Sequence, residues 1–216
     1  MTTLRPARMI SVGLGLTYLS TPDIQGFDMA GDPTGTLENN SFQGVAGICV
    51  TPIANLGVGL NLKYFQERIA DWTASGFGVD AGAVFRIPVA GISVGASVQN
   101  LGPSIKFISH EEELPMVIRA GASWHRALVP GMAGLTLAAD MVMPKHVDAY
   151  PAIGAELSIR DIVRLRGGYC GEPEREHNGI TAGGGIAIME RLTLDYAWTP
   201  YGDLGNFHRV SIWFSY

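Results

Sequence analysis

Apolar and polar side chains alternate along most of this chain. In the final stretch, HRVSIWFSY, the first phase consists of Val210, Ile212, Phe214 and Tyr216, and the second of Arg209, Ser211, Trp213 and Ser215. A period of two places successive side chains on opposite faces of a β-strand. The stretch therefore predicts a strand with one apolar and one polar face, without showing which face meets water.

The same alternation recurs in about twelve segments of roughly 9 to 11 residues, the length that a tilted strand needs to cross a bilayer. Residues 56–64, 77–86 and 92–99 are examples, and charges inside the segments fall in the polar phase. No stretch of helical period competes with this pattern. We predict an all-β chain that forms an antiparallel up-and-down transmembrane β-barrel, with about twelve strands present.

The joins between these segments alternate in length. The long ones cover residues 20–40, 66–75, 100–115, 144–151, 170–179 and 199–206. The short ones cover residues 51–55, 86–91, 127–131, 160–162 and 189–191. One rim should therefore carry long polar loops and the other tight turns, as in outer-membrane barrels.

Composition bears on which face is wet. Hydrophobic residues make up 47% of the chain and charged residues 16%, against about 25% charged in soluble domains. A soluble β-sandwich also explains the alternation, but it would have a surface built largely of Gly, Ser and Thr. The ends of the apolar phases carry aromatic residues suited to membrane interfaces: Tyr64, Trp124, Trp198 and Tyr216.

With the apolar phase facing lipid, the lumen of the barrel receives the charged residues of the strands. These are Lys63, Asp80, Arg86, Arg119, Asp140, Glu156, Arg160, Arg164, Arg166, Asp195 and Arg209. Two interpretations stay open for them: a lattice of salt bridges that fills a narrow barrel, or a constriction that selects solutes.

Other candidate sites carry weaker signals. Cys49 and Cys170 lie inside strands without metal-ligand spacing, so we expect buried, unreactive thiols rather than a disulfide or ligands. The acidic stretches 110–113 and 172–177 are expected to be solvated loops rather than cation sites. We expect neither a metal nor a cofactor.

The remaining signals argue against two classes of protein. His125 and His208 could pair with Ser123 and Ser211, but no spacing marks a nucleophile, so we expect no enzyme. A net charge of −5 without a Lys/Arg cluster argues against nucleic-acid binding. Arg5 and Arg8 precede an apolar stretch as in a signal peptide, but its alternation favours a strand.

Several blocks resemble, in order, the PorV/PorQ family of outer-membrane proteins, which belongs with the FadL-like barrels. They include SGFGVDAGAVF, GASVQNLGPSIKF, LPMVIRAGASW and the final LTLDYAWTPYGDLGNFHRVSIWFSY. The resemblance implies a fourteen-stranded barrel plugged by an N-terminal hatch. The leader, the hatch segment and the first two strands of that family have no counterpart here. We therefore expect residues 1–216 to form one shortened barrel domain in the bacterial outer membrane.

The resemblance implies two functions. PorV-like proteins serve type IX protein secretion by binding exported cargo and by contacting other secretion subunits, for which loops 20–40 and 100–115 would supply surface. FadL-like relatives carry small hydrophobic molecules across the outer membrane. The residues themselves do not separate these functions. From the resemblance we expect the type IX secretion role, with transport of small hydrophobic molecules as the alternative, and membrane lipid is an expected partner in both.

Overall fold

The computed structural model describes residues 2–7, 9–20, 24–27, 30–37, 39–69, 72–107, 110–173, 179–189, 192–200 and 205–215. Its first elements are the strands β1 (Thr2–Ala7), β2 (Ile10–Ser20), β3 (Ile24–Phe27), β4 (Pro33–Leu37), β5 (Asn39–Ile53), β6 (Leu56–Ile69) and β7 (Trp72–Ile87). The 3₁₀ turn η1 (Pro88–Ala90) leads to β8 (Ile92–Leu101), β9 (Ile105–Phe107), β10 (His110–Glu112), β11 (Val117–Val129) and β12 (Ala133–Pro144). The last strands are β13 (Tyr150–Ile159), β14 (Val163–Cys170), β15 (Ile180–Met189), β16 (Leu192–Pro200) and β17 (Asn206–Ser215).

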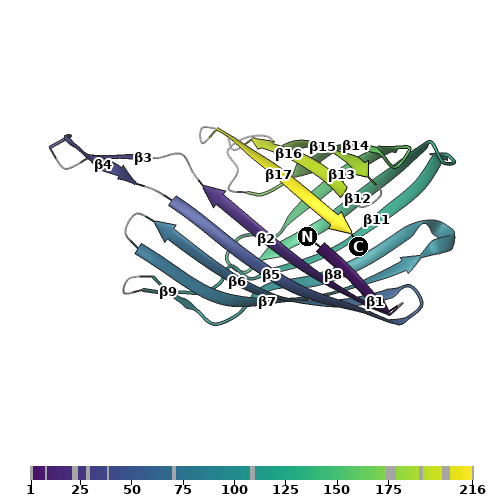
Figure 1. The fold of residues 1–216 in the computed structure, drawn as a ribbon, viewed down its shortest axis with the longest axis horizontal. Helices are drawn as coiled ribbons and strands as arrows, with labels where there is room; N and C mark the ends of the chain where they lie inside the picture. The colour runs from purple at the N-terminus through teal and green to yellow at the C-terminus, as the bar shows by residue number, and fades with distance from the viewer. Residues whose placement is uncertain are drawn as a thin grey trace.

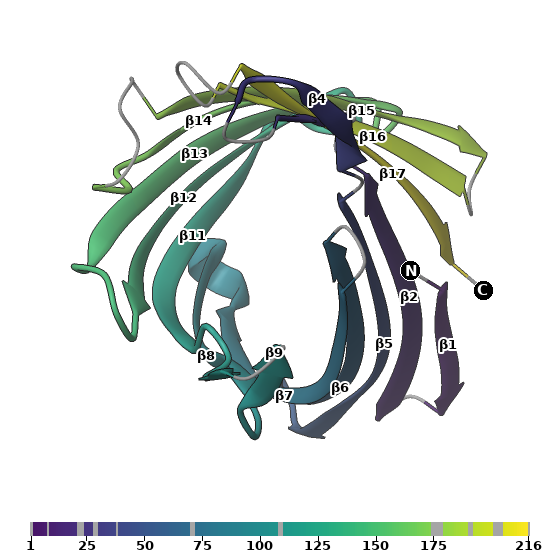
Figure 2. The ribbon, with the colours of Figure 1, turned by 90° about the vertical axis from the view of Figure 1, so that its left-hand side faces the viewer.

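Twelve of these strands form an antiparallel up-and-down sheet that curls into a barrel (Figures 1 and 2). Each pairs with the next in the order β2, β5, β6, β7, β8, β11 and on through β17. Among the described residues, no helix is long and apolar enough to span a membrane. The predicted fold class and strand number are thus confirmed.

The ring is joined through the short strand β1. It pairs antiparallel with β2 and parallel with β17, the latter by Thr2↔Phe214 and Thr3↔Ser215. These two parallel pairs are a small contact beside the nine antiparallel pairs that join β16 and β17. The twelve-stranded sheet is therefore bridged at this seam rather than closed by a full ladder between β2 and β17.

The apolar phase of the strands faces outward. Leu16 is 80% exposed and Ile212 is 64% exposed. Each of the ten remaining strands of the sheet also carries at least one exposed large apolar side chain. Buried hydrophobic side chains are few in the described part: Ala74, Leu114, Val142 and Tyr150. Such a chain has its hydrophobic surface outside, which is the arrangement of a barrel in lipid and the reverse of a soluble sandwich.

Loop lengths agree with the predicted asymmetry except at one place. The segment 66–75 was expected to be a long loop because it is polar, but β6 and β7 continue through it, with pairs such as Gln66↔Ser75 and Arg68↔Thr73. Polarity is compatible with strand pairing where a hairpin extends beyond the apolar band into water. This prediction was wrong for that reason.

Two other long joins contain small sheets of their own. Strands β3 and β4 form a two-stranded sheet separate from the barrel, and it projects beyond one end of the molecule (Figure 1). Strands β9 and β10 form a second one, with Lys106 opposite Glu111. Long joins therefore give this rim extra structure, whereas the opposite rim has the turn η1 and the tight turns 130–132 and 160–162.

Neighbouring residues of β17 test which face lies in lipid. We expect Ile212→Arg to lower the free energy of unfolding from phospholipid vesicles by about 2–4 kcal/mol, because it places a charge on the outward face. Ser211→Arg, one residue away and inward, should change it by less than about 1 kcal/mol. Urea titration of folded protein in vesicles measures both values. The opposite order would contradict the outward placement of the apolar phase.

Candidate functional site

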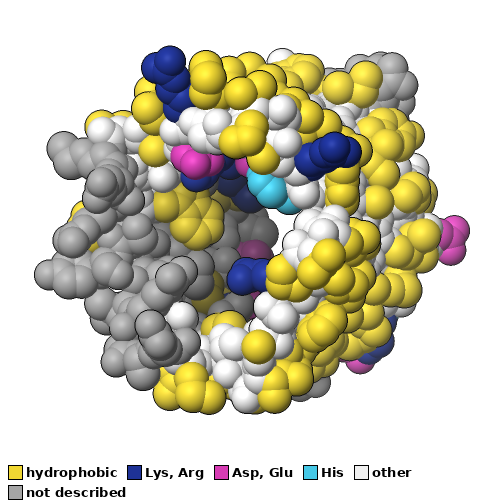
Figure 3. Space-filling model, turned by 90° about the vertical axis from the view of Figure 1, so that its right-hand side faces the viewer, with side chains coloured by type: hydrophobic (Ala, Val, Ile, Leu, Met, Phe, Trp, Pro, Cys, Tyr) yellow, Lys and Arg dark blue, Asp and Glu magenta, His cyan; other side chains and the backbone are white. Residues whose placement is uncertain are grey.

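The barrel encloses a hollow lumen, and its described strands line two cavities of similar size. Figure 3 looks into one end, where charged side chains surround a central opening and hydrophobic side chains cover the outside. The first cavity, about 570 Å³, is lined by strands between β2 and β12, and the second, about 540 Å³, by strands from β12 to β17. Both are large enough for a small organic molecule.

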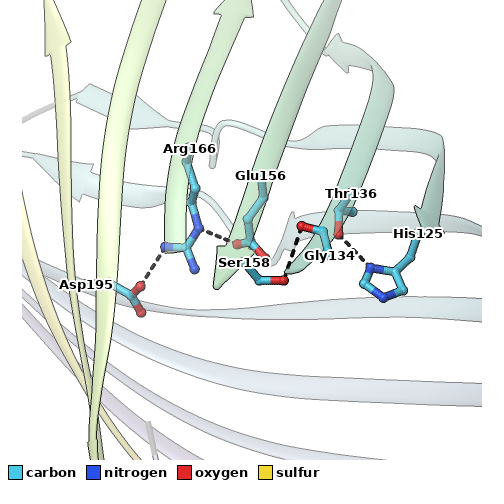
Figure 4. A network of polar contacts seen from close by, with 7 residues as sticks. All are labelled: His125, Gly134, Thr136, Glu156, Ser158, Arg166 and Asp195. Atoms are coloured by element: carbon cyan, nitrogen blue, oxygen red, sulfur yellow. Dashed lines mark hydrogen bonds and ion pairs between the residues drawn. The ribbon is translucent and has the colours of Figure 1, made fainter. Parts of the chain in front are cut away.

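Three charged side chains from three strands meet at the second cavity, and we call them the arginine triad (Figure 4). The Arg166 Nε donates to Glu156 Oε2 at 2.7 Å, and its Nη1 donates to Asp195 Oδ1 at 2.6 Å. A guanidinium bound by two carboxylates is held in a fixed orientation. The triad therefore presents a fixed polar surface to the lumen.

The small residues of β15 allow this triad to form across an intervening strand. Gly183 lies opposite Arg166 and Gly185 lies opposite Asp195. A Cβ added to Gly185 would collide with Asp195 Oδ1, so a larger residue there would displace the carboxylate. Glycine at this position thus leaves room for the Asp195 carboxylate that binds Arg166.

A second polar cluster holds a loop against the inner wall, and we call it the loop anchor: Lys63, Asp80 and Asn100. Lys63 Nζ lies 2.8 Å from both Asp80 Oδ1 and Asn100 Oδ1. The Asn100 backbone N–H donates to Asp80 Oδ1 at 2.9 Å, and Asp80 is only 8% exposed. A buried carboxylate with these partners is expensive to disrupt, because removing one partner leaves the charge unsatisfied.

Asn100 turns the chain back into the barrel. Its φ of 59° lies in the left-handed region, which asparagine tolerates better than most residues. Its side-chain Nδ2 donates to the carbonyl of Pro115 at 2.9 Å, which joins the two ends of the 100–115 loop. The loop anchor therefore fixes both where this loop begins and where it returns.

Beyond Asn100 the loop packs on the inner face of β7. A Cβ on Gly102 would lie 2.5 Å from the carbonyl of Phe77 and 2.6 Å from Leu114 Cδ1, so the approach requires glycine. Ile105 lies close to Gly76 and Leu114 close to Gly78, both on inward positions of β7. The apolar side chains of this loop narrow the lumen at the end with long loops.

An exposed ion pair fastens the outer part of the same loop. Glu113 pairs with Lys145, and its carboxylate also lies 3.6 Å from His146 Nε2. The hydrogen bond and the charge of Lys145 lower the pKa of Glu113 below its usual value of 4.5. Since the folded pKa is depressed, this contribution to stability is present above pH 4.5 and is lost as pH falls through the folded pKa.

The other predicted lumen charges share the inward phase without joining these clusters. Arg119 and Asp140 line the first cavity. Arg209 lines the second, with its guanidinium 5.6 Å from the centre of the Phe207 ring. Arg160 borders a smaller cavity of about 110 Å³. The inward positions of the strands also include Arg86 and Arg164.

Two groups of lumen charges form salt bridges, and the solute-selecting constriction stays a prediction. Lys63 with Asp80, and Arg166 with Glu156 and Asp195, are salt bridges between strands. Arg119 and Asp140 instead face open space in the first cavity without an ion pair among the described residues. Salt bridges therefore support the wall without filling the lumen.

The structure corrects the prediction for the thiols. Cys49 is exposed and Cys170 is half-buried, and both are free. Cys49 occupies an inward position of β5, and strands that face a hollow lumen leave such side chains accessible. The prediction was wrong because it assumed a packed interior.

The interfacial placement of the aromatic residues stays a prediction, although the described ones occupy outward positions. The Tyr64 ring lies 5.2 Å from that of Phe77 on the outward face, whereas Tyr216 lies outside the described residues. Trp124 and Trp198 occupy outward positions of β11 and β16. The histidines bond to residues other than serine among the described contacts: His125 Nδ1 lies 3.0 Å from Thr136 Oγ1, and His208 Nδ1 2.7 Å from Tyr196 Oη.

The acidic stretches are only partly described. Residues 110–112 form β10 rather than an irregular loop, and residues 174–178 of the second stretch lie outside the described residues. Among the described residues, no group of three or more His, Cys, Asp or Glu could hold a metal ion.

Sequence reasoning missed two residues that shape the lumen. The alternation gives no signal for Asn100, and it assigns Trp213 only to the polar phase of β17. A large aromatic residue among inward Gly, Ser and Thr positions is the signal that could have found Trp213.

The loop anchor can be tested by proteolysis of the loop that contains Lys106. We expect Asn100→Ala to speed trypsin cleavage after Lys106 at least tenfold in detergent micelles. The substitution removes two side-chain hydrogen bonds of about 1 kcal/mol each. Alanine also tolerates the left-handed φ at this position less well than asparagine does. The matched control is Asn61→Ala, which touches Asp80 at 3.4 Å but not the loop, and should cleave like the original chain. Equal rates for all three proteins would contradict the anchoring role.

No protein-family model matches this chain, and no curated protein sequence matches it. Solved structures do match. A FadL homologue from Pseudomonas aeruginosa superposes with a TM-score of 0.53 and 10% sequence identity, covering 96% of this chain and 69% of that one. At this identity the likeness concerns the fold, and this chain therefore has a FadL-like β-barrel fold.

Proposed function

We propose that this protein is an outer-membrane barrel through which small hydrophobic molecules cross the membrane. The observation that carries the proposal is the combination of an apolar outer face with a lumen that holds two cavities of about 570 and 540 Å³. A shell of this kind offers an apolar molecule a route that avoids the polar surface of the membrane. The FadL-like fold supports the same reading.

The lining of the cavities suits weakly polar ligands. Most inward positions carry Gly, Ala, Ser or Thr, and the charges of the arginine triad are bound to one another. Binding sites for small molecules are commonly apolar with a few fixed polar groups. The inward loop, with Leu114 and Ile105 against β7, adds apolar surface at the end with long loops.

Uptake by intact Gram-negative cells tests this function. Cells that produce the protein should take up the hydrophobic fluorophore N-phenyl-1-naphthylamine faster than cells without it. Gly154→Trp should abolish most of the gain, because the added Cβ has no contact closer than 3.5 Å and the ring would extend into the second cavity. The matched control is Ile153→Trp, the outward neighbour, which should leave uptake unchanged.

Two results would contradict the proposed function. One is uptake equal to that of cells without the protein although the barrel is folded in the outer membrane. The other is equal loss of uptake in the inward and outward tryptophan variants.

A role in type IX secretion is the second candidate function, and one observation favours it. The β3–β4 sheet projects beyond the barrel, so its strand edges are placed for pairing with another chain (Figure 1). Replacing residues 24–37 by a flexible linker should then abolish recovery of secreted proteins that share a C-terminal domain. Failure of the intact chain to recover any such protein would contradict this candidate and leave the transport proposal unaffected.

A further inference from the structure

In the described lining of the second cavity, Trp213 is an aromatic residue on an inward position. Trp213 lies on an inward position of β17, opposite Thr193, and it is 45% exposed. The inward positions next to it carry Ser211 on β17 and Thr193 on β16. A half-exposed indole in an otherwise small-residue lining offers a face on which a second ring can stack.

Farther along the strands from Trp213, glycine occupies several inward positions of the same cavity. Gly154, Gly168 and Gly183 all line the second cavity. On Gly168, a Cβ would lie 2.9 Å from the carbonyl of Ile153, and on Gly183, 2.8 Å from the carbonyl of Tyr196. These positions therefore require glycine, and no side chain projects from them into the cavity.

Among the described residues that line this cavity, the formal charges sum to zero. They are two carboxylates, Glu156 and Asp195, and two guanidiniums, Arg166 and Arg209. An anion such as a fatty-acid carboxylate, or a cation, therefore gains little from the cavity as a whole. The balance favours a neutral ligand.

The arginine triad is nonetheless able to bind a polar group on such a ligand. Two of the five N–H donors of a guanidinium are used by the carboxylates in the triad, and each carboxylate keeps further acceptor sites. Free donors and acceptors side by side match a hydroxyl group, which donates one hydrogen bond and accepts others.

The spacing of these groups matches a ring system. Asp195 pairs with Ser211, and Trp213 lies two residues further along the same face of β17, which is about 6.6 Å at the usual rise of a strand. A one- or two-ring molecule can therefore stack on Trp213 while a hydroxyl on its far edge reaches the arginine triad.

From these observations we infer that the second cavity binds a neutral hydroxylated ring compound, with its ring on Trp213 and its hydroxyl on the arginine triad. This inference rests on the proposed function and names the chemical class that the lumen selects. The first cavity lacks the ring-binding element, since its described lining includes Asp80, Arg119 and Asp140 but no aromatic side chain.

Binding of three probes to the purified full chain in detergent tests the inference. The probes are 2-naphthol, its anionic counterpart 2-naphthoate, and the ring-free alcohol 1-decanol, each measured by titration calorimetry. We expect 2-naphthol to bind roughly tenfold more tightly than 2-naphthoate. Trp213→Leu should weaken 2-naphthol roughly fivefold to tenfold, the size of a stacking contribution, and Trp213→Phe should weaken it less.

The control variant is Trp198→Leu, which removes a tryptophan from an outward position of β16 and should leave 2-naphthol binding unchanged. Unchanged 1-decanol binding in Trp213→Leu would show that the variant is folded and that the ring contact alone was lost.

Three outcomes would overturn the inference. Equal binding of 2-naphthol and 2-naphthoate would contradict the neutral selectivity, and equal losses in Trp213→Leu and Trp198→Leu would contradict the stacking site. In both cases continued binding of 1-decanol would leave the proposed function standing. Failure of the intact folded chain to bind any of the three probes would overturn the proposed function, and the inference with it.

Discussion

Backbone N–H and C=O groups in hydrocarbon have no water to bond, so each must find its partner within the protein. Every other property of this barrel depends on that constraint. The antiparallel ladders from β2 to β17 satisfy it, and they in turn oblige successive side chains to point alternately to lipid and to the lumen. The seam is the weakest part of this scheme, because β1 bridges it to β17 by only two residue pairs.

Because the apolar phase faces outward, the residues of the polar phase line the lumen. Here that phase consists mainly of small residues, and the result is a hollow barrel in which a few polar clusters fix the wall. The arginine triad links β13, β14 and β16 across the glycines of β15. The loop anchor holds the 100–115 loop inside, at Asn100 and Pro115. Small inward side chains leave the space of the cavities, and they also leave room for these clusters to form across strands.

Much of the fold could be predicted from local pattern, because successive residues of a strand between lipid and a wet lumen are alternately apolar and polar. The strand that ends the chain is an example: Val210 and Ile212 face outward as their phase indicated. Predictions failed where polarity was read as irregular structure, as at residues 66–75, which pair as extensions of β6 and β7. The prediction for Cys49 failed because alternation shows which face of the sheet a residue lies on, but not whether the lumen on that side is filled by side chains.

The polar clusters were less predictable for a related physical reason. The partners of Arg166 lie on β13 and β16, and their meeting depends on register and on Gly185 being small. Asn100 carries no periodic signal at all, since its importance comes from a left-handed φ and from contacts with Lys63, Asp80 and Pro115. Such contacts follow from three-dimensional closure and not from the alternation.

The alternation of environments can be measured with the protein's own thiol. In a Cys170→Ser background in lipid vesicles, Cys49 on the inward face of β5 should react readily with a charged, membrane-impermeant thiol reagent. Moving the thiol by one residue, with Cys49→Ser and Ile48→Cys, places it on the outward face, where it should be protected by lipid. Fast reaction at residue 49 and slow reaction at residue 48 is the predicted result, and the reverse order would contradict the inside-out barrel on which the account depends.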